Sequence, residues 1–253
     1  MPDRELRICA LYPDLMNIYA DRGNLALLEQ RCRWRGIGVT VTAAGLGDGV
    51  AAEDHDLFYL GGGQDRDQEL VAGDLVATKR DALHAAATRG ALILGICGGI
   101  QLLGHHYALG DREVPGVGLL DLVTVRSDGP RLIGNIAIEV ELEPGRPRLL
   151  AGFENHGGRT ILGPGAAPLG RVLRGHGNDG RSGMEGARQG SVIGTYLHGP
   201  LLPKNAWFAD WLIATALGMP QADLTPLDDA LEQRAHAEAC AAAGVKPRPW
   251  SDR

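Results

Sequence analysis

The stretch that most constrains this chain is residues 91–104, ALILGICGGIQLLG. Its first four residues are apolar and predict a short buried strand. The segment Gly95-Ile-Cys97-Gly-Gly99 follows, and then a second apolar run predicts a helix. A sharp strand-to-helix turn strains the backbone at a nucleophile, and flanking glycines let neighbouring chain pass close. A helix N-terminus also favours thiolate over thiol and stabilises an oxyanion. We therefore interpret Cys97 as a nucleophile.

A plainer interpretation of Cys97 is a small buried residue, because free cysteines are often buried. The G-x-C-x-G frame after an apolar strand favours the nucleophile. That frame is only moderately specific, so the interpretation needs a base elsewhere in the chain.

Composition excludes several function classes. The chain has 253 residues, a net charge of −6 and a pI of about 5.7. This net negative charge does not indicate a basic surface that would bind nucleic acid or an anionic membrane. The four cysteines form no C-x-x-C pair, which argues against a zinc knuckle or a thioredoxin motif. No secretory h-region or membrane-length apolar run is present, so we expect a cytoplasmic protein with reduced thiols.

The first half of the chain alternates strands with helices. Apolar and β-branched runs predict strands at 6–11, 37–42, 56–60 and 91–94. Helices are predicted at 25–35, with Asn24 as the N-cap and Gly36 as the stop, and at 68–89. This order predicts an α/β fold with a mainly parallel central sheet covered on both faces. Sites in such sheets lie beyond the carboxyl ends of the strands, so Gly61, Gly62 and Gly63 should neighbour Cys97.

The second half is glycine-rich and predicts more antiparallel structure. Strands are expected at 120–125, 135–142, 171–173 and 191–197, and helices at 204–217 and 226–243. Residues 246–253 are expected to form a loose tail. No linker is evident, so we treat residues 1–253 as a single domain.

Among the eight histidines, His198 is the best candidate base for Cys97. It closes the apolar strand 191–197, and Gly199-Pro200 then holds it in a turn. His105 and His106 are expected on the helix after Cys97, pointing away from it. His156, in a polar glycine-rich loop, competes as the base or as a substrate contact. In a Cys–His pair the imidazole accepts the thiol proton and later protonates the leaving amine.

The glycines at 61–63 supply backbone N–H groups beside the predicted nucleophile. Together with the N–H of Gly98 they would form an oxyanion hole. The alternatives are a flexible hinge or a phosphate-binding loop, but the chain has no G-K-[ST] and no G-x-G-x-x-G after the first strand. It also has no H-x-x-x-H or H-E-x-x-H, so we predict no metal site.

Taken together, Gly61-Gly-Gly63, Gly95-x-Cys97-x-Gly99 with Gln101, and Tyr196-x-His198-Gly199 resemble the class I glutamine amidotransferases. The Cys97 segment is similar to the branch that includes cobyric acid synthase glutaminase domains. Finer similarity points to the GatD family, the glutaminase subunits of lipid II isoglutaminyl synthase. The segments that carry it are LYPDLMNIYADRGN at 11–24, RLIGN at 131–135, GFENHGG at 152–158 and HGPLLPKN at 198–205.

This resemblance implies a flavodoxin-like three-layer sandwich and a divided reaction. The chain would hydrolyse glutamine to glutamate and ammonia. A MurT-like Mur ligase partner, in a heterodimer, would use ATP and magnesium to amidate the α-carboxylate of D-glutamate in lipid II. This chain itself would need no cofactor.

The resemblance also assigns roles to residues. Cys97 matches the nucleophile and His198 the base, while Gly62, Gly63 and Gly98 match the oxyanion region. Gln101 matches a position that lines the glutamine pocket. Arg131 matches an arginine that contacts glutamine, and a guanidinium pairs well with an α-carboxylate.

One departure concerns the third member of the triad. Many class I enzymes have His-Pro-Glu, whereas this chain has His198-Gly199-Pro200, which implies a dyad. Three alternatives stay open: a glutaminase for another acceptor such as a corrinoid, a non-catalytic docking module of the same fold, and a cysteine hydrolase with the same turn.

Overall fold

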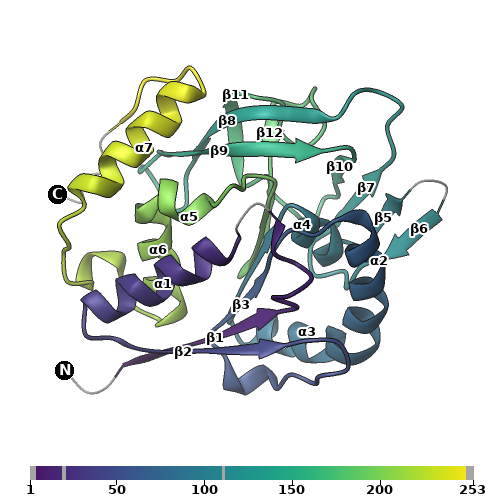
Figure 1. The fold of residues 1–253 in the computed structure, drawn as a ribbon, viewed down its shortest axis with the longest axis horizontal. Coiled ribbons are helices and arrows are strands. Elements are labelled where there is room, and N and C mark those ends of the chain that lie inside the picture. Colours follow the sequence, from purple (N-terminus) through teal and green to yellow (C-terminus); the bar gives the residue numbers. More distant parts are fainter. Residues whose placement is uncertain (1–3, 19–20, 110–111, 249–253) are drawn as a thin grey trace.

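The computed structural model describes residues 4–18, 21–109 and 112–248 (Figure 1). Its centre is a six-stranded sheet in the order β13-β14-β4-β3-β1-β2. Every neighbouring pair from β14 to β2 is parallel, and only β13 runs antiparallel at one edge. The strands are β1 Glu5–Leu11, β2 Gly38–Ala44, β3 Leu57–Leu60, β4 Leu92–Ile96, β13 Ala187–Gln189 and β14 Val192–Thr195. The predicted α/β fold with a mainly parallel sheet is confirmed.

The strand order reverses direction between β1 and β3. The connection from β1 moves outward to β2, whereas the connection from β3 moves the other way to β4. Because parallel crossovers are right-handed, such a reversal places the connecting helices on opposite faces of the sheet. It also opens a crevice at the carboxyl ends of β1 and β3, where ligands bind in folds of this kind.

Helix α1 (Arg22–Trp34) corrects one prediction. Asn24 does not cap it: Asn24 lies inside the helix, fully buried. Its side chain donates to the Tyr59 hydroxyl at 2.8 Å and accepts the backbone N–H of Leu202 at 2.8 Å. An asparagine that caps a helix and one that is buried in the core cannot be told apart from the local sequence. Here Tyr59 and Leu202, which are distant in sequence, provide the hydrogen-bond partners that make Asn24 a core residue. The predicted stop holds, since Gly36 follows the helix in a left-handed conformation (φ 67°).

The single long helix predicted at 68–89 is three consecutive segments. These are α2 (Asp65–Asp74), a π-helical turn (Leu75–Lys79) and α3 (Arg80–Thr88). The π turn brings Lys79 into the interior, where its ammonium contacts Asp74 at 2.7 Å and donates to the Gly45 carbonyl. A buried charge that needs these partners explains why the regular α-helical repeat is interrupted there.

The second half forms two further four-stranded sheets, which confirms its predicted antiparallel character. One has the order β10-β7-β5-β6 and the other β12-β11-β8-β9. The only parallel pair in them is β5 with β7. The strands are β5 His106–Leu109, β6 Arg112–Pro115, β7 Leu122–Val125, β8 Leu132–Val140, β9 Arg148–His156, β10 Arg159–Leu162, β11 Gly170–Arg174 and β12 Met184–Glu185.

Two histidine predictions are wrong in these sheets. The helix after Cys97, α4 (Gly98–Leu103), is only six residues long. His105 therefore lies beyond it, and His106 begins β5. His156 ends β9 rather than lying in a loop, and it is 3% exposed. Hydrogen bonds between β8 and β9 extend β9 to His156, and such pairing between distant segments cannot be predicted from the local sequence pattern.

The C-terminal part packs as helices. These are α5 (Leu201–Lys204), α6 (Ala206–Ala216) and α7 (Ala230–Ala242). In Figure 1 α1, α5 and α6 gather beside one another, in agreement with their many mutual contacts. Of the predicted loose tail, residues 249–253 lie outside the described residues, and Arg248 forms an ion pair with Glu139 at 2.7 Å. Within the described chain no helix combines the length and apolarity needed to cross a membrane.

A buried ion network joins α1 to the C-terminal helices. Arg31 is 0% exposed, and its guanidinium contacts Asp210 at 2.5 Å and Asp229 at 2.7 Å. Arg35 adds a second contact to Asp210 at 2.7 Å. Removing one partner from such a network leaves uncompensated buried charge, which is far more costly than losing an exposed pair.

We predict that Arg31→Ala lowers the free energy of unfolding by about 3–5 kcal/mol, because the buried Asp210 and the half-buried Asp229 lose a shared cation. Urea unfolding followed by circular dichroism measures this change. Arg33→Ala is the matched control on the same helix. Arg33 is exposed and pairs only with Glu29, so its loss is expected to be about 0.5 kcal/mol or less. Equal losses for both variants would contradict the prediction.

Candidate active site

Cys97 occupies a strained corner between β4 and α4. Its backbone has φ 52° and ψ −106°, and among the described residues only Tyr12 is another non-glycine with positive φ. A Cβ at Gly95 would lie 2.8 Å from the Gly99 carbonyl carbon, and one at Gly99 would lie 2.3 Å from the Leu60 carbonyl oxygen. The flanking glycines are therefore required by close backbone approach. Because α4 is short, the local N–H groups at its start matter more than a summed helix dipole.

The pairing of β14 with β4 brings His198 to the same edge of the sheet. Thr195 aligns with Ile96, and the Cys97 N–H donates to the Thr195 carbonyl at 2.8 Å. His198 follows three residues later and is fully buried. Its backbone exchanges two hydrogen bonds with Phe153 of β9, at 3.0 and 3.2 Å. His198 is thus fixed by two sheets at once.

Burial, with smaller electrostatic contributions from Lys204 and His156, lowers the pKa of His198 to about 4. The imidazole is therefore neutral at pH 7, the form that can accept a proton. Both charged groups acting on it are basic. This agrees with the sequence His198-Gly199-Pro200, which places no acid two residues after the histidine.

The glycine loop after β3 lies against the cysteine, as predicted. A Cβ on Gly62 would be 3.2 Å from the Cys97 Cβ. However, the Gly62 N–H donates to the Asp21 carboxylate at 2.7 Å. Within the described residues, the N–H groups of Gly63 and Gly98 donate no hydrogen bond. Of the three glycines predicted for the oxyanion hole, Gly63 and Gly98 therefore present open donors and Gly62 does not.

A cavity of about 580 Å³ opens above this edge of the sheet. Its wall includes four of the predicted site residues, namely Gly63, Cys97, Gln101 and Arg131. Gln101 is nearly buried, and its amide donates to the Tyr196 hydroxyl at 3.3 Å. The cavity also contains residues that the sequence analysis did not assign, among them Gln68 and Asn155.

Arg131 is held at the cavity wall by Asn155. Its Nε donates to the Asn155 side-chain oxygen at 2.9 Å, and its Nη2 donates to the Asn155 carbonyl at 3.0 Å. These bonds orient a planar guanidinium that is otherwise exposed. An oriented guanidinium beside Cys97 can bind a carboxylate through its remaining donors.

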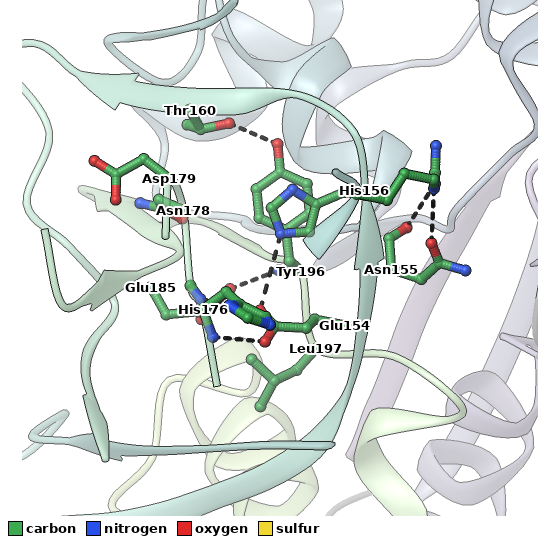
Figure 2. A network of polar contacts seen from close by, with 12 residues as sticks. Glu154, Asn155, His156, Thr160, His176, Asn178, Asp179, Glu185, Tyr196 and Leu197 are labelled. Atoms are coloured by element: carbon green, nitrogen blue, oxygen red, sulfur yellow. Dashed lines mark hydrogen bonds and ion pairs between the residues drawn. The ribbon is translucent and has the colours of Figure 1, made fainter. Parts of the chain in front are cut away.

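His156 is anchored by the buried polar network in Figure 2. Its ring stacks on Tyr196 with centroids 3.7 Å apart, and its Nδ1 lies 3.0 Å from the Gly158 carbonyl oxygen. Its Nε2 faces Glu154 at 3.9 Å. Unlike His198, His156 lines the cavity wall. His156 therefore lines the cavity, whereas His198 lies buried behind the same sheet edge.

Two fully buried glutamates complete this network. Glu154 accepts the backbone N–H groups of His176 and Gly177 at 2.6 and 2.9 Å. Glu185 accepts the Tyr196 N–H at 2.6 Å, and burial raises its pKa to about 8. Glu185 therefore stays largely protonated at pH 7, which limits repulsion from Glu154. Sequence reasoning missed both, because nothing local distinguishes a buried glutamate from an exposed one.

The sequence matches the CobB/CobQ-like glutamine amidotransferase domain over residues 7–206. The chain is 38% identical to the lipid II isoglutaminyl synthase (glutamine-hydrolyzing) subunit GatD of Streptococcus pneumoniae, over 84% of this chain and 81% of that protein. It is 40% identical to the subunit of the same name from Staphylococcus aureus, over 84% of each.

More distant matches point to the same family or to the same fold. Cobyric acid synthase of Pelotomaculum thermopropionicum is 34% identical over 77% of this chain but 37% of its own length. Among solved structures, PurLQS from Thermotoga maritima aligns with a TM-score of 0.55 and 23% identity, over 76% of this chain and 87% of that chain, which supports the fold alone.

The family model matches most of the chain, and the paired strands β4 and β14 bring Cys97 and His198 to one edge of the sheet; we conclude that this chain belongs to the CobB/CobQ-like glutamine amidotransferases.

Proposed function

We propose that this chain is the glutaminase subunit of a lipid II isoglutaminyl synthase, which hydrolyses glutamine to glutamate and ammonia. The observation that carries this proposal is the 38–40% identity to two GatD subunits over 81% and 84% of their lengths. The strained Cys97 lines the cavity, and a neutral His198 imidazole follows the neighbouring strand at the same sheet edge, which fits the chemistry of this reaction.

The proposed reaction proceeds through a thioester. His198 accepts the thiol proton as the Cys97 sulfur attacks the γ-carboxamide carbon of glutamine. The N–H groups of Gly63 and Gly98 stabilise the resulting oxyanion. His198 then returns the proton to the leaving nitrogen, and ammonia departs. A water molecule, deprotonated by His198, attacks the thioester and releases glutamate together with the regenerated thiol.

Arg131 and Gln101 would position the substrate. In this proposal the Arg131 guanidinium binds the α-carboxylate of glutamine, while Gln101 forms part of the pocket wall. The distance between Arg131 and the sheet edge would then select a substrate whose carboxylate and carboxamide are separated by a glutamine side chain.

The ammonia would be consumed by a separate ligase. We propose a MurT-type partner that binds ATP and magnesium and amidates the D-glutamate α-carboxylate of lipid II in the cytoplasm. The name of the GatD relatives describes them as subunits, which supports a partner complex. This chain would supply ammonia and contribute no cofactor site of its own.

A second candidate function is a glutaminase for a corrinoid acceptor. The similarity to cobyric acid synthase favours it, but this chain covers only 37% of that relative. Its two GatD relatives are instead matched over most of their length. The retained Cys97 and His198 argue against a purely structural docking module.

We predict that the purified wild-type chain releases glutamate from glutamine and that Cys97→Ala abolishes this release, because the thioester cannot form. Glutamate release is measured for the chain alone and for the chain mixed with a MurT-type ligase, ATP and lipid II. In the mixture, mass spectrometry follows formation of the isoglutaminyl product. Cys32→Ala, buried in α1 away from the cavity, is the control. Activity retained by Cys97→Ala would refute the nucleophile, and transfer to a corrinoid but not lipid II would favour the second function.

The pH profile tests the base. Because a protonated imidazole accepts no proton, activity should fall only as pH drops through the His198 pKa of about 4. We therefore expect kcat/KM to be nearly constant from pH 7 to pH 5, instead of halving near pH 6.5 as for an ordinary histidine.

Two variants separate the histidines in that assay. His198→Ala is expected to lower kcat by about 10²–10⁴-fold, the usual contribution of a general base. His156→Ala is expected to act mainly on KM, because that residue lines the cavity wall. The reverse ranking would transfer the role of base to His156.

Arg131→Ala is expected to raise the KM for glutamine by about 10–100-fold with a smaller change in kcat, because a charge-assisted pair to the α-carboxylate contributes about 1.5–3 kcal/mol. Arg131→Lys keeps the charge but loses the fork geometry, so an intermediate KM is expected. Steady-state kinetics measure both. An unchanged KM for Arg131→Ala would exclude this role.

A further inference from the structure

One buried carboxylate beside the site has no role in the reaction described above. Asp21, at the start of α1, is 0% exposed, and no cation among the described residues forms an ion pair with it. Its Oδ2 accepts only the Gly62 N–H at 2.7 Å, and its Oδ1 has no hydrogen-bond partner within the described residues. Burial raises its pKa to about 7. A carboxyl group held this way is energetically costly, so its retention calls for an explanation.

The loop that Asp21 contacts is built without side chains. A Cβ at Gly61 would lie 2.3 Å from the Met16 carbonyl oxygen, one at Gly62 would lie 2.7 Å from Ile18 Cγ2, and one at Gly63 would lie 2.5 Å from Met16 Sδ. A side chain at Gly61 would collide with backbone, and one at Gly62 or Gly63 would require Ile18 or Met16 to shift. Because glycine backbones rotate freely, polar contacts must fix the peptide orientations.

Three hydrogen bonds fix those orientations. Asp21 accepts the Gly62 N–H, and the Ile18 N–H donates to the Gly62 carbonyl at 3.0 Å. The Gln68 side-chain amide donates to the Gly63 carbonyl at 2.8 Å. The N–H and C=O of a trans peptide point in opposite directions. The bond from Ile18 to the Gly62 carbonyl therefore turns the Gly63 N–H the other way, away from Ile18.

Asp21 is itself held rigidly. The Tyr59 hydroxyl donates to the Asp21 carbonyl at 3.2 Å, and Asn24 donates to the same hydroxyl at 2.8 Å. Tyr59 belongs to β3, the strand that leads directly into the glycine loop. The carboxylate and the loop that it contacts are thus anchored to the same strand.

We propose that Asp21 and Gln68 are positioning residues that lock the glycine loop with the Gly63 N–H open to the oxyanion that forms at Cys97. This inference rests on the proposed function. In this proposal Asp21 acts at one remove: it binds the N–H of the Gly61–Gly62 peptide, which adjoins the peptide that carries the Gly63 N–H. Gln68, whose amide also packs against Gly98, steadies the loop from the α2 side. Without these bonds the peptides would rotate, and the transition state would lose an N–H donor.

The test compares Asp21→Ala with Asp21→Asn in the wild-type background, with the ligase partner present. Asparagine keeps a side-chain oxygen that accepts the Gly62 N–H, whereas alanine does not. We expect Asp21→Ala to lower kcat for glutamate release by about 10–100-fold with little change in KM, since an oxyanion donor contributes up to about 10²–10³ in rate. Asp21→Asn should stay within about threefold of wild type on the same argument.

Alkylation of Cys97 by iodoacetamide separates positioning from general disruption. That displacement breaks a carbon–iodine bond at sp³ carbon and forms no oxyanion, so its rate should be unchanged in Asp21→Ala. The matched control is Asp14→Ala, which removes the same charge from the same connection but at an exposed side chain paired with Arg22. It should match wild type in both assays.

Each outcome decides the proposal. Equal kcat for Asp21→Ala and wild type overturns it, and so does a parallel loss of alkylation and hydrolysis, which would indicate disruption of the cysteine itself. If Asp21→Ala fails to fold, Gln68→Leu serves as the second variant, and an unchanged kcat there overturns the proposal. Absence of hydrolysis by the wild-type complex would instead reject the proposed function, which keeps the two failures distinct.

Discussion

The parallel pairing of β14 with β4 is the interaction on which the site depends. It aligns Thr195 with Ile96 and binds the Cys97 N–H to the Thr195 carbonyl. Two residues that are far apart in the chain, Cys97 and His198, then leave the sheet at the same edge. Both strands are fully buried and mostly apolar, so the hydrophobic core that stabilises the fold also holds Cys97 and His198 at this edge.

The remaining parts of the site are supplied by connections rather than by the sheet. The reversal of strand order places the β1–α1 connection and the glycine loop after β3 side by side, which is where Asp21 meets Gly62. The antiparallel sheet β12-β11-β8-β9 contributes the opposite wall through Arg131, Asn155 and His156. The cavity is therefore lined both by residues that follow strands of the parallel sheet, such as Gly63 and Cys97, and by residues of the added antiparallel one.

Electrostatics at the site follows from burial. The pKa of His198 falls and those of Asp21 and Glu185 rise, each chiefly because desolvation disfavours the charged form. At pH 7 the His198 imidazole is therefore neutral, and Glu185, which accepts the Tyr196 N–H, is mostly protonated. Burial, together with the basic neighbours Lys204 and His156, therefore keeps the His198 imidazole neutral although the chain places no acid two residues after it.

The sequence by itself determined the local features: the strand–cysteine–helix corner, the glycine loop, the parallel first half and the late strand that ends at His198. These depend on short-range pattern and on steric limits that glycine alone satisfies. Only the tertiary structure decided that Asn24 is a core residue, that His156 ends a strand, and that the Gly62 N–H is bound by Asp21. Each of these features depends on a partner that is distant in sequence. The local sequence around a polar group is the same whether that group binds water, a helix terminus or a buried carboxylate.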